Sequence, residues 1–248
     1  MKTVLIDCSP KKRMSASGFI ASMTDVFLRG KREKEKLRVP ADHARILEKV
    51  KDADNAVFSM PLYVDGVPSH VLPFLKEAEE YCRENGLHPN VYVIANNGFI
   101  EGRQNEPLMR IMENFCDRAG LIWKGGLGIG GGVMMNVMRI MITVFFALML
   151  ISLVLSGFGT APLITFGQQL LSVLLLGCGI IAFDLRLAAC INRGKSYGKH
   201  YTRIMVPSFV FILFADIFFT VLSVFQGGIF RGWLKAKKPE TVSRKQAE

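Results

Sequence analysis

The most restrictive feature of this sequence is a long run of residues, 140–183, that contains no charged side chain. A helix needs about 20 mostly apolar residues to cross a bilayer, so this run is long enough for two spans. A turn with glycine and proline at 157–162 separates its two halves. A second apolar block, 204–225, is interrupted only by Asp216 and is also long enough to span. The sequence therefore predicts a membrane region of two or three helices.

The charges divide the chain into parts of different character. Residues 1–132 carry 19 Lys and Arg and 17 Asp and Glu, which is the charge density of a soluble domain. The remaining residues carry 12 and 4, and their basic side chains lie in clusters beside apolar runs. We therefore expect a soluble domain over 1–132, a hydrophobic membrane region over 133–226 and a basic tail over 227–248.

The basic clusters also predict the orientation in the membrane. The turn at 157–162 has no Lys or Arg, whereas a basic loop follows the second apolar segment. The positive-inside rule then places the soluble domain on the cytoplasmic side of the cell membrane. The tail conflicts with this rule if there are three spans, and agrees with it if the third segment lies in the interface. Both arrangements remain open. The loop contains Arg186, Arg193, Lys195, Lys199 and Arg203.

Two classes of function are disfavoured. The soluble part has no basic patch interleaved with aromatic residues, so nucleic-acid binding is not expected. The cysteines form no CxxC motif and no Cys/His cluster, so no metal site is expected. Their odd number and apolar surroundings are typical of reduced thiols in a cytoplasmic domain.

Strand and helix patterns alternate through the soluble part. Apolar, β-branched runs predict four strands, and a weaker signal at 37–39 suggests a short edge strand. Right-handed crossovers would build them into a five-stranded, doubly wound parallel sheet. The strands are expected at 3–7, 37–39, 56–58, 90–95 and 121–123, and the helices at 15–28, 41–51, 70–84 and 106–119.

A last helix, needed to cover one face of such a sheet, does not follow the fifth strand. One candidate for that role is the end of the second apolar block, 184–192. This leaves open an alternative in which part of that block is a buried core helix. The stretch 126–131 also matches a dinucleotide-binding glycine pattern, but no second strand or acidic residue follows at the needed distance. We interpret it as an exit loop.

Three loops follow neighbouring strands and should meet at the carboxyl edge of the sheet, where ligands bind in open α/β folds. The loop 9–17 precedes a helix and carries Lys11 and serines, which favours phosphate binding; an ordinary solvated loop is the alternative. The loop 61–68 is held by prolines and presents Tyr63, which can stack on a flat ligand. The third loop is 96–104.

Four stretches at these strand ends carry a family resemblance. They are Cys8-Ser-Pro with Ser15-Ala-Ser17, Pro61-Leu-Tyr-Val-Asp65 with Pro68-Ser69, Asn97-Gly-Phe99, and Gly126-Leu-Gly-Ile-Gly130. On these residues, the chain resembles the flavodoxin-like NAD(P)H-dependent oxidoreductases, the NADPH-dependent FMN reductase group. The resemblance covers roughly 1–132, and the Pro-Leu-Tyr-Val-Asp stretch is its most specific part.

The resemblance implies a flavodoxin-like fold and an FMN site. The phosphate would be held by the serines of the first loop, beside Lys11. The second loop would pack beside the isoalloxazine ring, and the third would complete the rim of the site. No catalytic acid or base is required, because the cofactor carries the chemistry. The implied residues are Ser9, Ser15, Ser17, Pro61, Leu62, Tyr63, Val64, Asn97, Gly98 and Phe99.

The implied activity is hydride transfer from NAD(P)H to FMN, and then to a small-molecule or quinone acceptor. The alternative is a non-enzymatic, membrane-tethered module that transfers electrons or senses redox state. A third hypothesis is a domain that binds no flavin, because the first loop has Lys-Lys-Arg-Met where such loops often carry Gly or Asn. The resemblance also implies a homodimer paired across the site, which a membrane anchor would either prevent or fix.

Overall fold

The structure is a computed structural model of the chain, and it describes residues 1–12, 15–156 and 159–225. The chain divides into two compact units, Met1–Met205 and Val206–Glu248. In the second unit the described residues form one helix, α7 (Ser208–Phe225). The basic tail expected over 227–248 lies outside the described residues.

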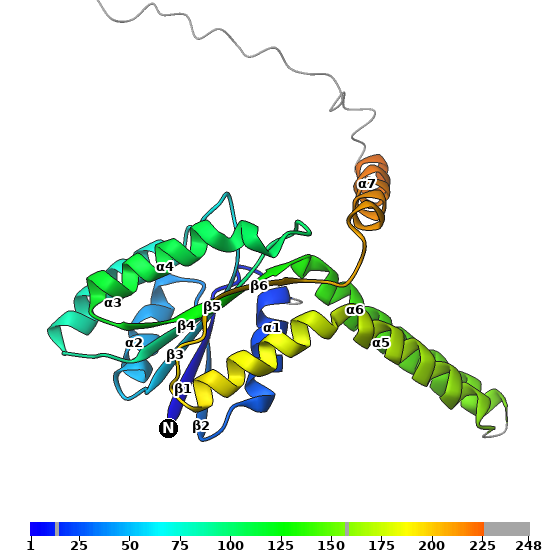
Figure 1. Ribbon diagram of the computed structural model, residues 1–248, viewed down its shortest axis with the longest axis horizontal. Helices are drawn as coiled ribbons and strands as arrows, with labels where there is room; N and C mark the ends of the chain where they lie inside the picture. Colours follow the sequence, from blue (N-terminus) through cyan, green and yellow to red (C-terminus); the bar gives the residue numbers. More distant parts are fainter. Residues whose placement is uncertain (13–14, 157–158, 226–248) are drawn as a thin grey trace, which may run out of the picture. The chain divides into compact units, whose positions relative to one another are not determined.

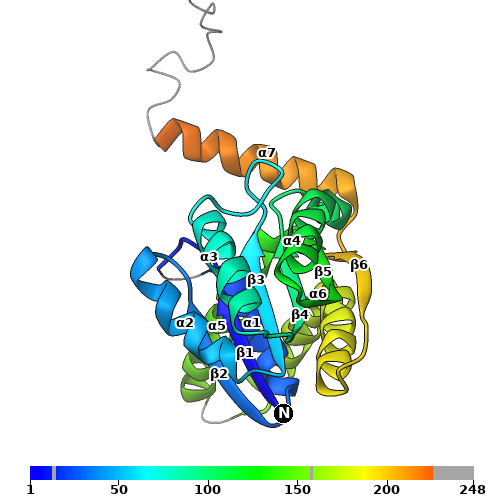
Figure 2. The same cartoon turned by 90° about the vertical axis from the view of Figure 1, so that its left-hand side faces the viewer.

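The first unit is built on a parallel sheet of six strands, in the order β2-β1-β3-β4-β5-β6. The order of the first five strands is that of the flavodoxin-like fold, so the predicted fold class is confirmed. The sheet has one strand more than the five expected, and β2 and β6 form its two edges (Figure 2). The strands are β1 (Lys2–Asp7), β2 (Lys31–Lys36), β3 (Asn55–Pro61), β4 (Asn90–Asn96), β5 (Ile122–Gly130) and β6 (Gly198–Arg203).

Helices cover both faces of the sheet. Helices α2, α3 and α4 lie on one face, and α1 and the end of α6 lie on the other (Figure 1). The core on the first face is rich in phenylalanine, with Phe58, Phe74 and Phe115 all buried. The helices are α1 (Ala16–Phe27), α2 (His43–Lys51), α3 (Val71–Glu84), α4 (Glu106–Ala119), α5 (Gly132–Leu155) and α6 (Ala161–Asn192), with short helices η1 (Pro40–Asp42) and η2 (Gly102–Asn105).

Strand β2 corrects the prediction at 37–39, because it lies at Lys31–Lys36 and contains only Lys, Arg and Glu. An edge strand needs a partner on one side only, so it tolerates a charged sequence. Its charges are paired across to α2: Glu35 accepts from Lys49, and its other oxygen lies 2.6 Å from Arg45. Hydrophobic periodicity cannot detect such a strand, because none is present.

Strand β6 replaces part of the predicted basic loop. It adds to β5 in parallel register, with Gly125 opposite Gly198. Lys199 lies 2.6 Å from Glu113 on α4, so this cation of the predicted basic loop pairs within the domain. A glycine and five polar or aromatic residues between two apolar blocks give little strand signal, so the sequence did not predict β6.

Helix α1 buries a different face from the one its apolar residues predict. Ile20 is buried as expected, but Val26 is 70% exposed. The buried stripe includes the polar residues Ser17 and Thr24. These hydroxyls face partners on other elements, so tertiary hydrogen bonds have overridden the apolar pattern.

Helix α6 has two environments along one continuous length. Its first half has exposed apolar residues such as Leu171, whereas the residues from Asp184 to Ile191 include a buried stripe beside α1 and the sheet. The stretch 184–192 therefore does cover the open sheet face. The compact unit consequently extends to Met205, beyond the boundary at 132 that composition suggested.

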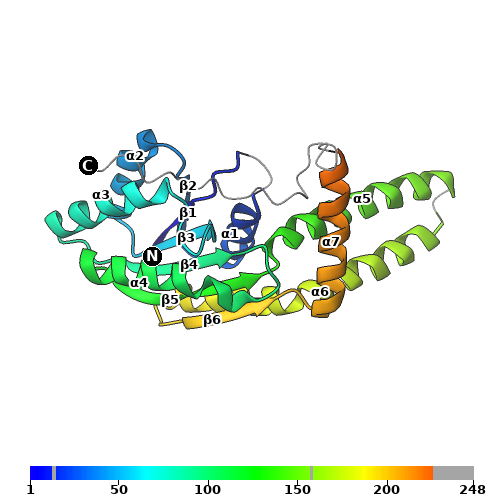
Figure 3. The same ribbon diagram turned by 90° about the horizontal axis from the view of Figure 1, so that it is seen from above.

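Among the described residues, three helices are long and apolar enough to cross a membrane: Met134–Leu155, Ala161–Asn192 and Ser208–Phe225. Helices α5 and α6 run side by side beyond the sheet (Figure 3) and form a helical hairpin. Their apolar side chains are largely exposed there, with Phe146 packed on Phe166 at 5.8 Å. The first two helices thus form a hairpin that is joined to the sheet domain at both ends: α5 begins two residues after β5, and the end of α6 covers the sheet.

The contact between α1 and α6 contains a buried carboxylate. Thr24 Oγ1 donates to Asp184 Oδ1 at 2.6 Å, and Asp184 Oδ2 has no partner among the described residues. We expect Thr24→Val to lower the free energy of unfolding by about 1–3 kcal/mol, because it leaves a buried carboxylate unpaired. Thermal unfolding of the detergent-solubilised chain, followed by intrinsic fluorescence, measures this.

The matched control for that variant is Ser22→Ala on the same helix. The Ser22 hydroxyl donates to Gly18 O at an exposed position, so its loss should change stability by less than about 0.5 kcal/mol. Combining Thr24→Val with Asp184→Leu should recover part of the loss, because removing both partners leaves no unpaired group. Equal effects of Thr24→Val and Ser22→Ala would contradict this account.

Candidate functional site

The predicted site lies at the carboxyl edge of the sheet, where four strands end at one level. Asp7 at the end of β1 pairs with Ser59 of β3. Pro61 at the end of β3 pairs with Asn96 of β4, which in turn pairs with Ile129 of β5. Parallel strands in this register deliver their following loops to one edge.

A hydrogen-bond network ties these strand ends and α1 together. The Ser59 hydroxyl donates to Ser17 O at 2.9 Å, and the Ser17 hydroxyl donates to Asn96 Oδ1 at 2.8 Å. The Leu62 N–H donates to Asn96 O at 2.8 Å, and the Cys8 N–H donates to Ser59 O at 2.8 Å. The structure therefore brings together the three loops that the sequence placed at this edge.

Within the first loop, the predicted phosphate-binding residues separate into two groups. Ser9 is buried, and its Oγ accepts from the Lys11 N–H at 3.4 Å; Ser17 is also buried. Ser15 is the N-cap of α1 and accepts from the Gly18 N–H at 3.0 Å, and Lys11 is exposed. Thus the Ser9 and Ser17 hydroxyls bond to other protein groups, whereas Lys11 and Ser15 remain accessible to a ligand from solvent.

Two further residues shape this loop that sequence reasoning did not single out. Arg38, just after β2, donates to Ser9 O at 3.3 Å and to Lys11 O at 2.5 Å. Asp7 accepts from the Ser9 N–H at 3.1 Å. Burial raises the pKa of the Asp7 carboxyl above its usual value, although the Ser9 hydrogen bond and the charges of Arg38 and Lys36 oppose the shift. A basic residue two positions after a charged strand was the only available signal.

The second loop contains a tight turn with unusual backbone angles. Tyr63 and Gly66 exchange two hydrogen bonds of 3.0 Å. The two residues between them, Val64 and Asp65, have φ values of 47° and 56°. Positive φ at both central positions is the pattern of a type I′ turn, which favours Asn and Gly and is strained for a β-branched residue. Val64 is nevertheless fully exposed, so burial of its side chain does not offset the strain.

The remaining predicted residues form a partly apolar rim. Pro61 and Leu62 are half-buried and Tyr63 is 43% exposed. In the third loop Gly98 is exposed and Phe99 is 65% exposed.

Asn97 lies beneath that third loop and is buried. Its Nδ2 donates to Glu101 O at 2.9 Å. Its Oδ1 is buried and accepts no hydrogen bond among the described residues. A buried acceptor without a donor is unusual and is compatible with a ligand that donates to it.

The glycine pattern at 126–131 has a packing role. Gly126 and Gly128 lie within β5, and a Cβ at either position would collide with Met109 or with the Tyr201 ring. A Cβ at Gly130 would meet the carbonyl of Ile100. These glycines allow η2 and β6 to approach β5 closely, so the pattern is no dinucleotide-binding loop. Because residues 126–130 belong to the strand, the interpretation of 126–131 as an exit loop was wrong.

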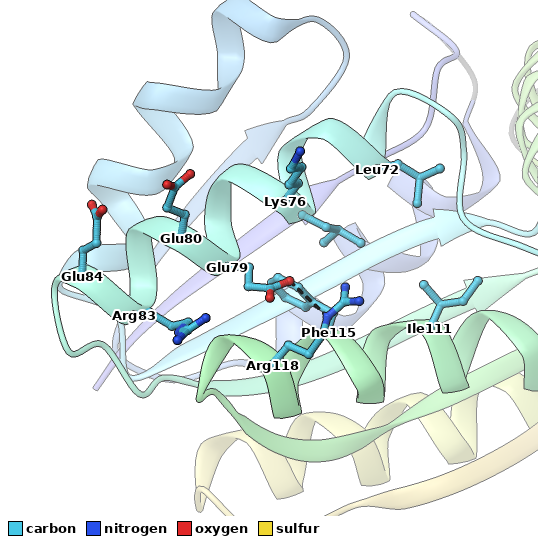
Figure 4. Close-up of a pocket in the computed structure, with 10 residues that line it drawn as sticks. Leu72, Lys76, Glu79, Glu80, Arg83, Glu84, Ile111, Phe115 and Arg118 are labelled. Carbon is cyan, nitrogen blue, oxygen red and sulfur yellow. Dashed lines mark ion pairs between the residues drawn. The ribbon is translucent and has the colours of Figure 1, made fainter.

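A separate hollow lies between α3 and α4 (Figure 4). It is lined by charged residues, with Glu79 and Arg118 paired at 3.1 Å, around Leu72, Ile111 and Phe115. It contains none of the residues predicted for the site. The described residues contain no group of three His, Cys, Asp or Glu side chains able to hold a metal ion.

Three features of the carboxyl edge bear on whether it can hold FMN. Apolar side chains at the rim are exposed, and Asn97 Oδ1 is a buried hydrogen-bond acceptor. The amino end of α1, together with Lys11, provides an anion-binding environment. None of the described residues 9–12 and 15–17 has positive φ, so the absence of glycine at these positions causes no backbone strain. The rest of the predicted Lys-Lys-Arg-Met stretch, Arg13 and Met14, lies outside the described residues. The residues fit the group, with Asp7 as an anionic departure.

Comparison with known proteins gives structural matches only, because no family model and no curated protein matches the chain. The Trp repressor binding protein from Bacillus subtilis is 18% identical, with 52% of this chain and 84% of that chain covered and a TM-score of 0.44.

Two other matching structures are described as quinone reductases. The NADPH-quinone reductase from P. pentosaceus is 13% identical, with 55% of this chain and 94% of that chain covered and a TM-score of 0.44. The NAD(P)H:quinone oxidoreductase from Methanothermobacter marburgensis is 16% identical, with 56% of this chain and 92% of that chain covered and a TM-score of 0.42. At these identities and scores, the similarity carries no argument about activity.

The turn at Val64 makes a prediction about stability. We expect Val64→Asn to raise the free energy of unfolding by about 1 kcal/mol, because Asn adopts positive φ more readily than Val. The matched control is Val26→Asn, an equally polar change at an exposed helical position with ordinary φ. Thermal unfolding of both variants measures the difference. If Val26→Asn stabilises as much, backbone strain at Val64 is not the cause.

Asp7 makes a prediction about pH. Its pKa in the folded protein lies above the unfolded value of 3.8, so the folded state binds the proton more tightly. The stability that Asp7 contributes is full below its unfolded pKa and is lost as the pH rises through its higher pKa in the folded protein. Asp7→Asn should therefore melt at a higher temperature than the parent at pH 7, and equally below the unfolded pKa. The exposed Asp52→Asn should change neither value; a pH-independent effect of Asp7→Asn would contradict the assignment.

Proposed function

We propose that this chain is a membrane-anchored, FMN-dependent NAD(P)H oxidoreductase. The observation that carries the proposal is the network from Ser59 through Ser17 to Asn96. It holds three loops in register at the carboxyl edge of a flavodoxin-like sheet and leaves apolar side chains open on them. This is the edge at which such sheets bind ligands.

Each loop then has a role in holding the cofactor. Lys11, the Ser15 hydroxyl and the first N–H groups of α1 would hold the phosphate. Tyr63 and Val64 would contact the ring, because the strained turn presents both side chains to solvent. Phe99 would close the opposite rim.

When bound, FMN would supply the hydride chemistry between NAD(P)H and an acceptor. The residues of the chain would bind, orient and shield the ring. Asp7 is an anionic departure in this environment, and burial raises the pKa of its carboxyl. The acceptor would be a small molecule or a quinone.

The helical hairpin of α5 and α6 supports the membrane part of the proposal. Its exposed apolar surface would be solvated by lipid rather than water. With the soluble domain on the cytoplasmic side, NAD(P)H would reach the carboxyl edge from the cytoplasm.

The test is the visible absorption of the detergent-purified full chain, before and after addition of NADPH. Flavin bands near ~450 nm that bleach support the proposal, because bleaching requires both the cofactor and a working hydride path. Bands that persist would instead support an electron-transfer or redox-sensing module. If no band forms even after FMN is added, the flavoprotein proposal is wrong.

A variant pair tests the site itself. Tyr63→Ala should weaken FMN binding by roughly tenfold, because loss of a stacked aromatic ring costs about 1 kcal/mol or more. Ile122 is an exposed apolar residue at the amino ends of the strands, far from the carboxyl edge, so Ile122→Ala should leave FMN binding unchanged. Titration of both variants with FMN provides the comparison. Equal affinities would remove Tyr63 from the site.

A further inference from the structure

The helical hairpin leaves the sheet domain without a spacer. The Met138 side chain of α5 packs directly on Gly177 of α6. At the same level, the Met205 N–H, just after β6, donates to Leu176 O at 2.8 Å. Everything up to 138 on α5 and from 176 on α6 therefore lies beside the domain. Only 139–155 and 161–175 extend beyond it.

The length of the free hairpin is short for a bilayer. At a rise of about 1.5 Å per residue, the free part of α5 is about 25 Å long and that of α6 about 22 Å. The hydrocarbon core of a typical bilayer is about 30 Å thick. A hairpin that spans it must therefore draw the end of β6 to the hydrocarbon boundary, and a tilted hairpin would draw it closer still.

The surface at that level combines apolar and basic side chains. Met205 is 58% exposed. The Arg139 guanidinium lies 5.6 Å from the centre of the Phe19 ring, near the start of α1. Lys11 and Lys12 are exposed on the loop that precedes the same helix. Cations beside exposed apolar groups are what an anionic headgroup layer attracts.

We propose that the carboxyl edge of the sheet, from the end of β6 to the loop before α1, is a lipid-contacting surface that lies in the headgroup layer of an anionic bilayer. The proposal rests on membrane insertion of the hairpin but not on FMN binding. A ligand bound at this edge would lie beside the headgroups. An amphiphilic acceptor could then reach it without crossing water.

Single tryptophans in nanodiscs test this contact. Phe is substituted for Trp123 and Trp233, and the full chain is reconstituted in an equal mixture of phosphatidylcholine and phosphatidylglycerol. Met205→Trp is the probe at the edge. Phe146→Trp on the hairpin is the control for membrane insertion, and Ile122→Trp on the opposite edge is the control for exposure to water. The acyl chains carry bromine either near the headgroup or near the methyl end.

If the carboxyl edge contacts lipid, tryptophan at 205 should lose roughly half its emission when the bromine is near the headgroups, and less when it is near the methyl end. This pattern is expected for a side chain about 5–10 Å deep in the interface. Tryptophan at 146 should be quenched by deep bromine, and tryptophan at 122 by neither. If 146 is quenched and 205 is not, the hairpin spans but the edge stands away from lipid, and the inference is overturned. If 146 is not quenched, insertion itself fails and the inference falls with it.

Discussion

The contact between α1 and the end of α6 supports the rest of this structure. It closes the sheet face that a last helix must cover, and it joins the hairpin to the sheet domain through one uninterrupted helix. At its centre a buried carboxylate, Asp184, has Thr24 as its hydrogen-bond partner. A buried, half-satisfied carboxylate costs stability, but it favours one register of the two helices over others.

Helix α1 is consequently shared by two regions with different tasks. Its first turn carries Ser15 and Ser17 and begins at the candidate phosphate loop, while Phe19 in the same turn contacts Arg139 of α5. The two regions are therefore linked by direct packing over adjacent turns of one helix.

Periodicity and turn chemistry predicted most of the soluble part. The first, third and fourth strands and the four amphipathic helices lie where the pattern indicates. The pattern did not locate the two edge strands, because one contains only charged residues and the other is short and polar. Both strands pair with partners distant in sequence. For the candidate site, the sequence located the loops but not the orientation of each side chain. Ser9 and Ser17 turn inward to protein partners, and Arg38 and Asp7 gave no distinguishing local signal.

The sequence by itself determined the parallel α/β class, the three loops at one sheet edge and the apolar helices able to cross a membrane. These follow from local periodicity and composition, which act within a few turns of chain. Only the tertiary structure decided that one helix, α6, is both part of the hairpin and the last cover of the sheet, and that β6 returns to extend that sheet. Composition describes such a helix as one apolar block. Burial differs between its two ends, because only one end packs against the sheet, and that depends on residues distant in sequence.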